Sequence, residues 1–187
     1  LAHIKRSHVL TDNIFQLNAC FPFEVAKYAV EANIQKFIFL SSIKVNGEVT
    51  EEGETFGHAS KPAPSDIYAQ SKFYAEEKLK TLFGKKTEIS IIRLPLVVGA
   101  FAKGNVGLIQ MLVRNRIPIP AANLNFNSRS IVLLKDLCDV AHHMLTSKRN
   151  ITGLHFIKHH KNLSSKELIQ FIGRLEKRQP ILFSMPL

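Results

Sequence analysis

The sequence predicts an α/β fold in which helices cover both faces of a parallel sheet. Three observations lead to this prediction. Short apolar runs, rich in β-branched residues, alternate with longer stretches of helical spacing. The apolar runs are continuous rather than alternating with polar residues, which is typical of strands buried on both faces. Serine, proline or glycine follows the runs, where the chain leaves a strand. Strands that alternate with helices favour a parallel sheet.

The elements follow from these patterns in chain order. The spacing predicts helices at 11–33, 66–83, 106–115, 135–147 and 164–177, strands at 36–42, 87–99, 130–134 and 154–158, and loops at 46–64 and 118–129. Pro22 predicts a kink or a restart in the first helix. Gly84 is a plausible C-cap glycine for the second. Ser164 followed by Glu167 predicts a capping box for the last.

Composition narrows the possible classes of protein. The chain has 187 residues with 45% hydrophobic and 21% charged content, an ordinary globular balance. Its apolar runs are too short for a membrane span. Cys20 and Cys138 lie far apart, so we expect no disulfide framework and a reducing, cytoplasmic compartment.

The formal net charge of +10 fits nucleic acid, an anionic membrane surface or a phosphorylated small molecule. The basic residues are scattered and form no run of five, which argues against nucleic acid as the partner. His142 and His143 are adjacent and point to different sides of a helix, so we expect no metal site.

A tyrosine and a lysine lie four residues apart in DIYAQSKFYAEEKL, residues 66–79. Tyr68 and Lys72 would share one helix face. A lysine cation beside a phenol favours the phenolate and would allow Tyr68 to act as a general acid/base. Ser42 ends the strand FIFLSS, at the edge of a parallel sheet where ligands bind. Alone, the pair could equally be a chance spacing, and the serine could simply close its strand.

The stretches FIFLSSIKVNG, YAQSK and RLPLVVG, in this order, resemble the extended short-chain dehydrogenase/reductase family. The resemblance is to its NAD-dependent epimerase/dehydratase type, the nucleotide-sugar 4-epimerases and 4-keto-reductases. It also includes Asn18 in the first helix and Arg129 before KDLCDVAHHML. The resemblance implies a partial Rossmann-like sheet with a small C-terminal substrate lobe.

The resemblance implies roles for single residues. Tyr68 would be the general acid/base, Lys72 would lower its pKa and hold the nicotinamide ribose, and Ser42 would bind the reacting oxygen of the sugar. Further implied contacts to NAD or NADP come from Ala2, Asn18 and Pro95. Implied contacts to the nucleotide diphosphate come from Asn105, Arg129 and Lys103. Lys44 could add charge there, or be a solvated loop lysine.

The resemblance also implies partners. The substrate would be a nucleotide diphosphate sugar used for surface polysaccharide precursors, and the complete protein would be a homodimer without membrane contact. We expect residues 1–98 and 135–158 to form a truncated Rossmann-like domain. Residues 99–134 and 159–187 would form part of the substrate-binding lobe.

Several positions depart from the family pattern. The glycine-rich turn that holds the dinucleotide is absent from the sequence, so we expect a chain truncated at both ends. Asn46 replaces the commoner tyrosine of VYG, and Phe21 and Pro22 replace Gly-Thr. Leu96 replaces an asparagine that contacts sugar, which favours the branch acting on acylated, deoxygenated amino sugars.

Two other hypotheses stay open. A Rossmann-like relative could be a binding module for RNA or protein without catalysis. Alternatively, the chain could be a folded fragment unable to bind the cofactor.

Overall fold

The computed structural model describes residues 11–51 and 53–184, apart from the side chains of residues 11 and 12. The chain forms two compact units. The first unit contains the residues up to Pro95 together with Cys138–Ile157, and the second contains Leu96–Leu137 and the residues from Lys158 onward. The substrate-binding role expected for the second stretch stays a prediction.

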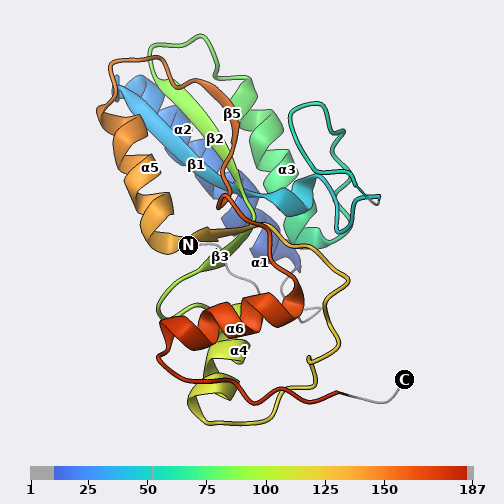
Figure 1. The fold of residues 1–187 in the computed structure, drawn as a ribbon. Helices are drawn as coiled ribbons and strands as arrows, with labels where there is room; N and C mark the ends of the chain where they lie inside the picture. The colour runs from blue at the N-terminus through green and yellow to red at the C-terminus, as the bar shows by residue number, and fades with distance from the viewer. Residues whose placement is uncertain (1–10, 52, 185–187) are drawn as a thin grey trace. The chain divides into compact units, whose positions relative to one another are not determined.

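A parallel sheet forms the centre of the first unit (Figure 1). Its strand order is β1-β2-β5, with bounds Lys36–Ser42, Glu88–Leu94 and Gly153–Phe156. Ile89, Ile91 and Ile92 of β2 are fully buried, as expected for a central strand whose two faces are covered. The predicted α/β fold with a parallel sheet is therefore confirmed.

Helices cover this sheet. Figure 1 shows α5 on one side of it and α2 and α3 on the other. The bounds are Phe21–Glu31 for α2, Ile67–Lys80 for α3 and Leu134–Thr146 for α5. Small side chains let α2 and α3 approach the sheet, and the core there contains Ala19, Ala26, Phe39, Ala75, Leu79, Ile89 and Ile91.

The first predicted helix is three segments rather than one. It consists of α1 (Thr11–Phe15), the π-helix η2 (Gln16–Cys20) and α2. Pro22 lies in the first turn of α2, directly after the π-helix. The predicted restart is therefore present, but a wider π turn precedes it, and such turns are frequent at functional sites.

The predicted strand 87–99 is divided at Pro95. Its first part is β2, whereas its second part, β3 (Leu96–Val98), belongs to the second unit and pairs in parallel with β4 (Ile131–Leu133). Proline lacks the N–H that would continue the ladder. Two helices pack beside this pair, α4 (Gly104–Arg114) and α6 (Ser165–Leu175), around a core that includes Val98, Val106, Ile131, Leu168 and Ile172.

None of the helices in the described ranges is long and apolar enough to cross a membrane. The described residues also contain no group of three His, Cys, Asp or Glu side chains with the geometry of a metal site.

Candidate active site

Ser42 is the last residue of β1 and lies at the carboxyl end of the parallel sheet. It is buried, and its Oγ accepts a hydrogen bond of 3.3 Å from the backbone N–H of Lys44. This bond opens the short 3₁₀ helix η3 (Ile43–Val45). The turn holds the serine hydroxyl at the edge of the sheet where ligands bind in open α/β folds.

Tyr68 lies in the first turn of α3. The helix begins at Asp66, whose Oδ1 accepts from the backbone N–H of Ala69 at 2.7 Å, a standard N-cap. The Ser42 hydroxyl lies close enough to the Tyr68 phenol to lower the pKa of that phenol. The Lys72 ammonium lies 6.0 Å from the centre of the Tyr68 ring. The fold thus brings together the three residues that the sequence singled out as catalytic, whereas their roles stay predictions.

The pKa of Tyr68 is raised, chiefly by burial. The Ser42 hydroxyl lowers this pKa, the Asp66 carboxylate raises it and the Lys44 ammonium lowers it. Lys44 is the cation that lowers the pKa of Tyr68 here, and the lowering expected from Lys72 stays a prediction. The Lys72 ammonium donates to the carbonyl of Leu40 at 3.0 Å.

Lys72 is itself 5% exposed. Burial lowers its pKa from 10.5 to about 8, and the nearby Glu76 carboxylate opposes this shift. The ammonium lies 4.7 Å from the centre of the Phe39 ring, which partly replaces its lost hydration. A lysine with so low a pKa in a buried position is typical of functional sites.

Asn18 occupies the middle of the π-helix η2 and is 1% exposed. Neither polar atom of its side chain has a hydrogen-bond partner. A buried amide without partners costs free energy, so its presence calls for a ligand group or an ordered water. The residue therefore fits the cofactor contact implied for it, which stays a prediction.

A buried ionic network lies behind the site, and sequence reasoning missed it. Arg93 of β2 is 2% exposed and donates through Nε to Oε1 of Glu76 at 2.9 Å; Glu76 is fully buried. The Ser41 hydroxyl donates to the same Glu76 oxygen. Arg93 also donates to Oδ1 of Asn46 at 2.9 Å, and Asn46 in turn donates to the Ser60 carbonyl.

Two sequence signals could have revealed this network. Glu76 follows Lys72 by four residues and so shares its helix face. Arg93 is a charged residue inside an apolar strand, and it stands opposite Ser41 in the parallel register. The network also gives a role to Asn46, the residue that replaces the family's tyrosine.

The remaining predicted site residues lie elsewhere. Pro95 is half-buried and ends the first unit. Lys103, Asn105 and Arg129 are exposed residues of the second unit. Ala2 lies outside the described residues. Leu96, which replaces the sugar-contacting asparagine, packs against the core of the second unit.

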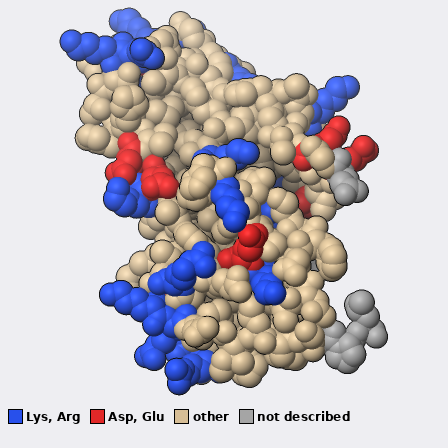
Figure 2. Space-filling view, in the orientation of Figure 1, with Lys and Arg blue, Asp and Glu red and all other residues tan. Residues whose placement is uncertain are grey.

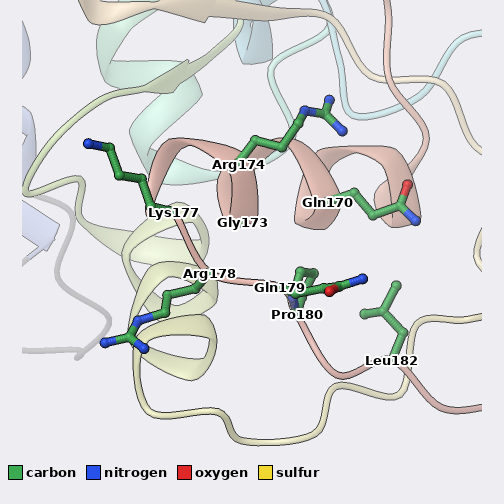
Figure 3. A pocket seen from close by; sticks show the side chains of 8 residues that line it. All are labelled: Gln170, Gly173, Arg174, Lys177, Arg178, Gln179, Pro180 and Leu182. Carbon is green, nitrogen blue, oxygen red and sulfur yellow. The ribbon is translucent and has the colours of Figure 1, made fainter.

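The second unit carries most of the net positive charge. It has eleven Lys and Arg against three Asp and Glu, a net charge of +8 out of the total of +10. A hollow of about 490 Å³ lies at the end of α6, lined by Gln170, Gly173, Arg174, Lys177, Arg178, Gln179, Pro180 and Leu182. Figure 3 shows that Arg174, Lys177 and Arg178 point away from one another, so they do not converge on one ligand group.

Comparison with known proteins identifies the family of the chain. Residues 1–157 match the NAD dependent epimerase/dehydratase family. The chain is 31% identical over 173 residues to a UDP-glucose 4-epimerase of Vibrio cholerae, covering 88% of this chain and 53% of that protein. The chain therefore spans about half the length of this relative.

Solved structures share the fold at low identity. A UDP-glucuronic acid 4-epimerase from Bacillus cereus in complex with NAD superposes with a TM-score of 0.79 at 17% identity, covering 98% of this chain and 61% of that one. A UDP-glucose 4-epimerase from Thermus thermophilus in complex with NAD gives 0.76 at 18% identity, covering 100% and 63%. The match over residues 1–157 and the parallel sheet place the chain in one family: it belongs to the NAD dependent epimerase/dehydratase family.

Proposed function

We propose that the protein interconverts or reduces nucleotide sugars at the sugar C4 position, with Tyr68 as the general acid/base. The observation that carries this proposal is the meeting of Ser42, Tyr68 and Lys72 at the carboxyl end of the sheet. A nicotinamide cofactor, NAD or NADP, would supply hydride transfer at the same carbon. Its positive charge in the oxidised form also offsets the effect of burial on the phenol.

In the proposed mechanism the Tyr68 phenol acts first. Tyr68 takes the proton from the sugar hydroxyl and returns it in the reverse step. The Ser42 hydroxyl, which lies beside the Tyr68 phenol, holds the oxygen that gains or loses this proton. Lys72 holds the nicotinamide ribose, and the unpartnered amide of Asn18 binds on the cofactor side.

The substrate proposed is a nucleotide diphosphate sugar. The exposed residues Lys103, Asn105 and Arg129 supply two positive charges and an amide for the diphosphate, and the net charge of +8 in their unit supports an anionic ligand. Because Leu96 replaces an asparagine and packs on the core, an apolar group on the sugar suits this position better than a hydroxyl. The product would enter surface polysaccharide synthesis.

We also propose a homodimer. Leu17, Phe21, Val25 and Tyr28 recur at helical spacing along η2 and α2, and each is at least 40% exposed. Burial of such a stripe against a second copy would remove it from water. The variant Phe21→Glu should then be monomeric by sedimentation while the parent is dimeric; an unchanged state would remove this proposal.

Product analysis tests the proposed activity. UDP-glucose is incubated with NAD and the protein as its gene encodes it, and the nucleotide sugars are separated by chromatography. UDP-galactose should appear, or, with a 4-keto sugar and NADPH or NADH, the reduced sugar. Absence of turnover with both cofactors across glucose, glucuronate and N-acetylglucosamine forms would contradict the proposal.

A second candidate, RNA binding, is favoured by one observation. The second unit carries a net charge of +8, and Figure 2 shows Lys and Arg side chains gathered on part of its surface. RNA affinity should then fall steeply with salt, and it should fall in Lys177→Glu/Arg178→Glu but hardly in Tyr68→Phe. RNA binding that is lost in Tyr68→Phe, or is absent at low salt, would remove this candidate.

A further inference from the structure

Lys44 contacts both sides of the proposed site. Its backbone N–H donates to Oγ of Ser42 at 3.3 Å. Its ammonium, on the other side, donates to Oδ2 of Asp66 at 2.8 Å and to Oε1 of Glu48 at 2.7 Å. The side chain is 41% exposed, so it is neither a free loop lysine nor a buried one. Its ammonium forms ion pairs with both carboxylates.

Asp66 links Lys44 to α3. Its second carboxylate oxygen caps the helix at the backbone N–H of Ala69, 2.7 Å away. Tyr68 lies inside the capped turn, so the position of its ring depends on the cap. One carboxylate thus binds Lys44 with one oxygen and fixes the turn that carries Tyr68 with the other.

We propose that Lys44 is a positioning residue for the Ser42–Tyr68 pair, holding the turn after β1 against the first turn of α3 through its ion pair with Asp66. This inference rests on the proposed function for its catalytic meaning. Its structural content, a Lys44–Asp66 latch that sets the surroundings of the Tyr68 hydroxyl, does not require turnover.

The latch has an electrostatic signature. Three charged groups lie around Tyr68: Lys44 from η3, and Asp66 and Lys72 from α3. Lys44 lowers the pKa of Tyr68 and Asp66 raises it, whereas the Lys72 ammonium is directed to the Leu40 carbonyl. The two members of the latch therefore act in opposite directions on the same phenol.

Opposite shifts of the Tyr68 pKa in the two variants would show that both charges face the phenol. Lys44→Met removes the positive charge, so the pKa of Tyr68 should rise. Asp66→Asn keeps an oxygen that can cap Ala69 but removes the negative charge, so the pKa of Tyr68 should fall. If neither charge lay beside the phenol, neither variant would move the titration; whether the ion pair also holds the two turns together is tested by the kinetics.

The experiment is a titration of the phenol by ultraviolet difference absorbance on the protein as its gene encodes it. The same variant with Tyr68→Phe serves as the blank, because the chain also contains Tyr28 and Tyr74. Glu48→Gln is the matched control, since it removes the other carboxylate partner of Lys44 and leaves the latch. Opposite shifts in Lys44→Met and Asp66→Asn, with a far smaller shift in Glu48→Gln, are expected.

Kinetics give the second readout. Lys44→Met should lower kcat by roughly tenfold or more through misplacement of the pair, with KM nearly unchanged, and Lys44→Arg should restore most of it. A raised KM with unchanged kcat would overturn the inference, because Lys44 would then bind substrate. An unchanged Tyr68 titration in Lys44→Met would overturn it as well.

The two readouts separate this inference from the proposed function. Opposite titration shifts combined with equal turnover of the parent and Tyr68→Phe would support the latch and refute the proposed function. Loss of turnover in Tyr68→Phe with no titration shift in Lys44→Met would support the function and refute the latch.

Discussion

The two units differ in where their charged side chains lie, some of them buried in the first unit. The buried Lys, Arg and Glu side chains of the described residues, Lys72, Glu76 and Arg93, all lie in the first unit. The second unit has the larger net positive charge, but its ion pairs Arg114–Glu176 and Lys161–Glu167 lie at the surface. Charges are costly to bury, so the buried charges of the first unit are paired or hydrogen-bonded beside the candidate site, whereas the ion pairs of the second unit stay at the surface.

The largest expected effect on stability comes from the buried pair. Arg93→Met leaves the Glu76 carboxylate buried without its partner, and the protein should lose about 3–5 kcal/mol of unfolding free energy, measured by urea denaturation. The double variant Arg93→Met/Glu76→Leu removes both charges and should recover much of that loss. A single variant as stable as the parent would mean that the first unit does not depend on its buried charges.

Lys72→Met, unlike Arg93→Met, should raise the free energy of unfolding. Because the pKa of Lys72 is lowered to about 8, the folded state resists its protonation. This penalty is fully present below pH 8 and disappears as the pH rises toward 10.5, so the parent gains stability over that interval.

The expected gain of Lys72→Met at pH 7 is roughly 1–3 kcal/mol, after allowance for the lost hydrogen bond to Leu40. The gain should shrink between pH 8 and pH 10, measured by urea denaturation at each pH. Lys78→Met, which removes a lysine outside the buried face of the same helix, is the control. A variant less stable than the parent at pH 7 would contradict the burial cost assigned to this lysine.

For substitutions in the second unit, the expected changes in the free energy of unfolding are smaller. Ser164 Oγ accepts from the backbone N–H of Glu167 at 3.1 Å, and the Glu167 carboxylate accepts from that of Ser164 at 2.9 Å. Ser164→Ala should cost about 0.5–2 kcal/mol in thermal or urea unfolding. Glu167→Gln keeps an acceptor and should change little; equal losses in both variants would show that charge, rather than the cap, stabilises α6.

The smallest change in stability is expected on loss of a surface ion pair. Arg114 donates to Glu176 at 2.6 and 2.9 Å, but its side chain is half-exposed. Arg114→Gln should leave the unfolding midpoint unchanged within error, because solvent and salt screen such pairs. A loss comparable to that of Arg93→Met would remove the distinction drawn between the two units.

Elements with their own local signals could be predicted from the sequence. The strand 36–42 and the capping box of Ser164 and Glu167 are present as predicted. Each depends on a few neighbouring residues. The π-helix at 16–20, which packs against α3, could not be predicted, because only Pro22 marked an irregularity there.

The candidate site likewise has features that could be predicted from the sequence and features that could not. The positions of Ser42, Tyr68 and Lys72 follow from strand and helix patterns and from the family resemblance. The direction of the Tyr68 pKa does not, because it depends on burial and on Lys44, which approaches α3 from a different segment. The Arg93–Glu76 pair likewise joins residues that are 17 positions apart and meet only in the fold.

The turnover of Tyr68→Phe tests the central claim most directly. The variant removes one hydroxyl at the proposed site, and Tyr74→Phe removes the matching hydroxyl from an exposed position on the same helix. With UDP-glucose as substrate, or another nucleotide sugar found to turn over, kcat should fall about 10²–10⁴-fold in Tyr68→Phe and stay unchanged in Tyr74→Phe. Equal kcat for Tyr68→Phe and the parent would contradict the assignment of proton transfer to Tyr68.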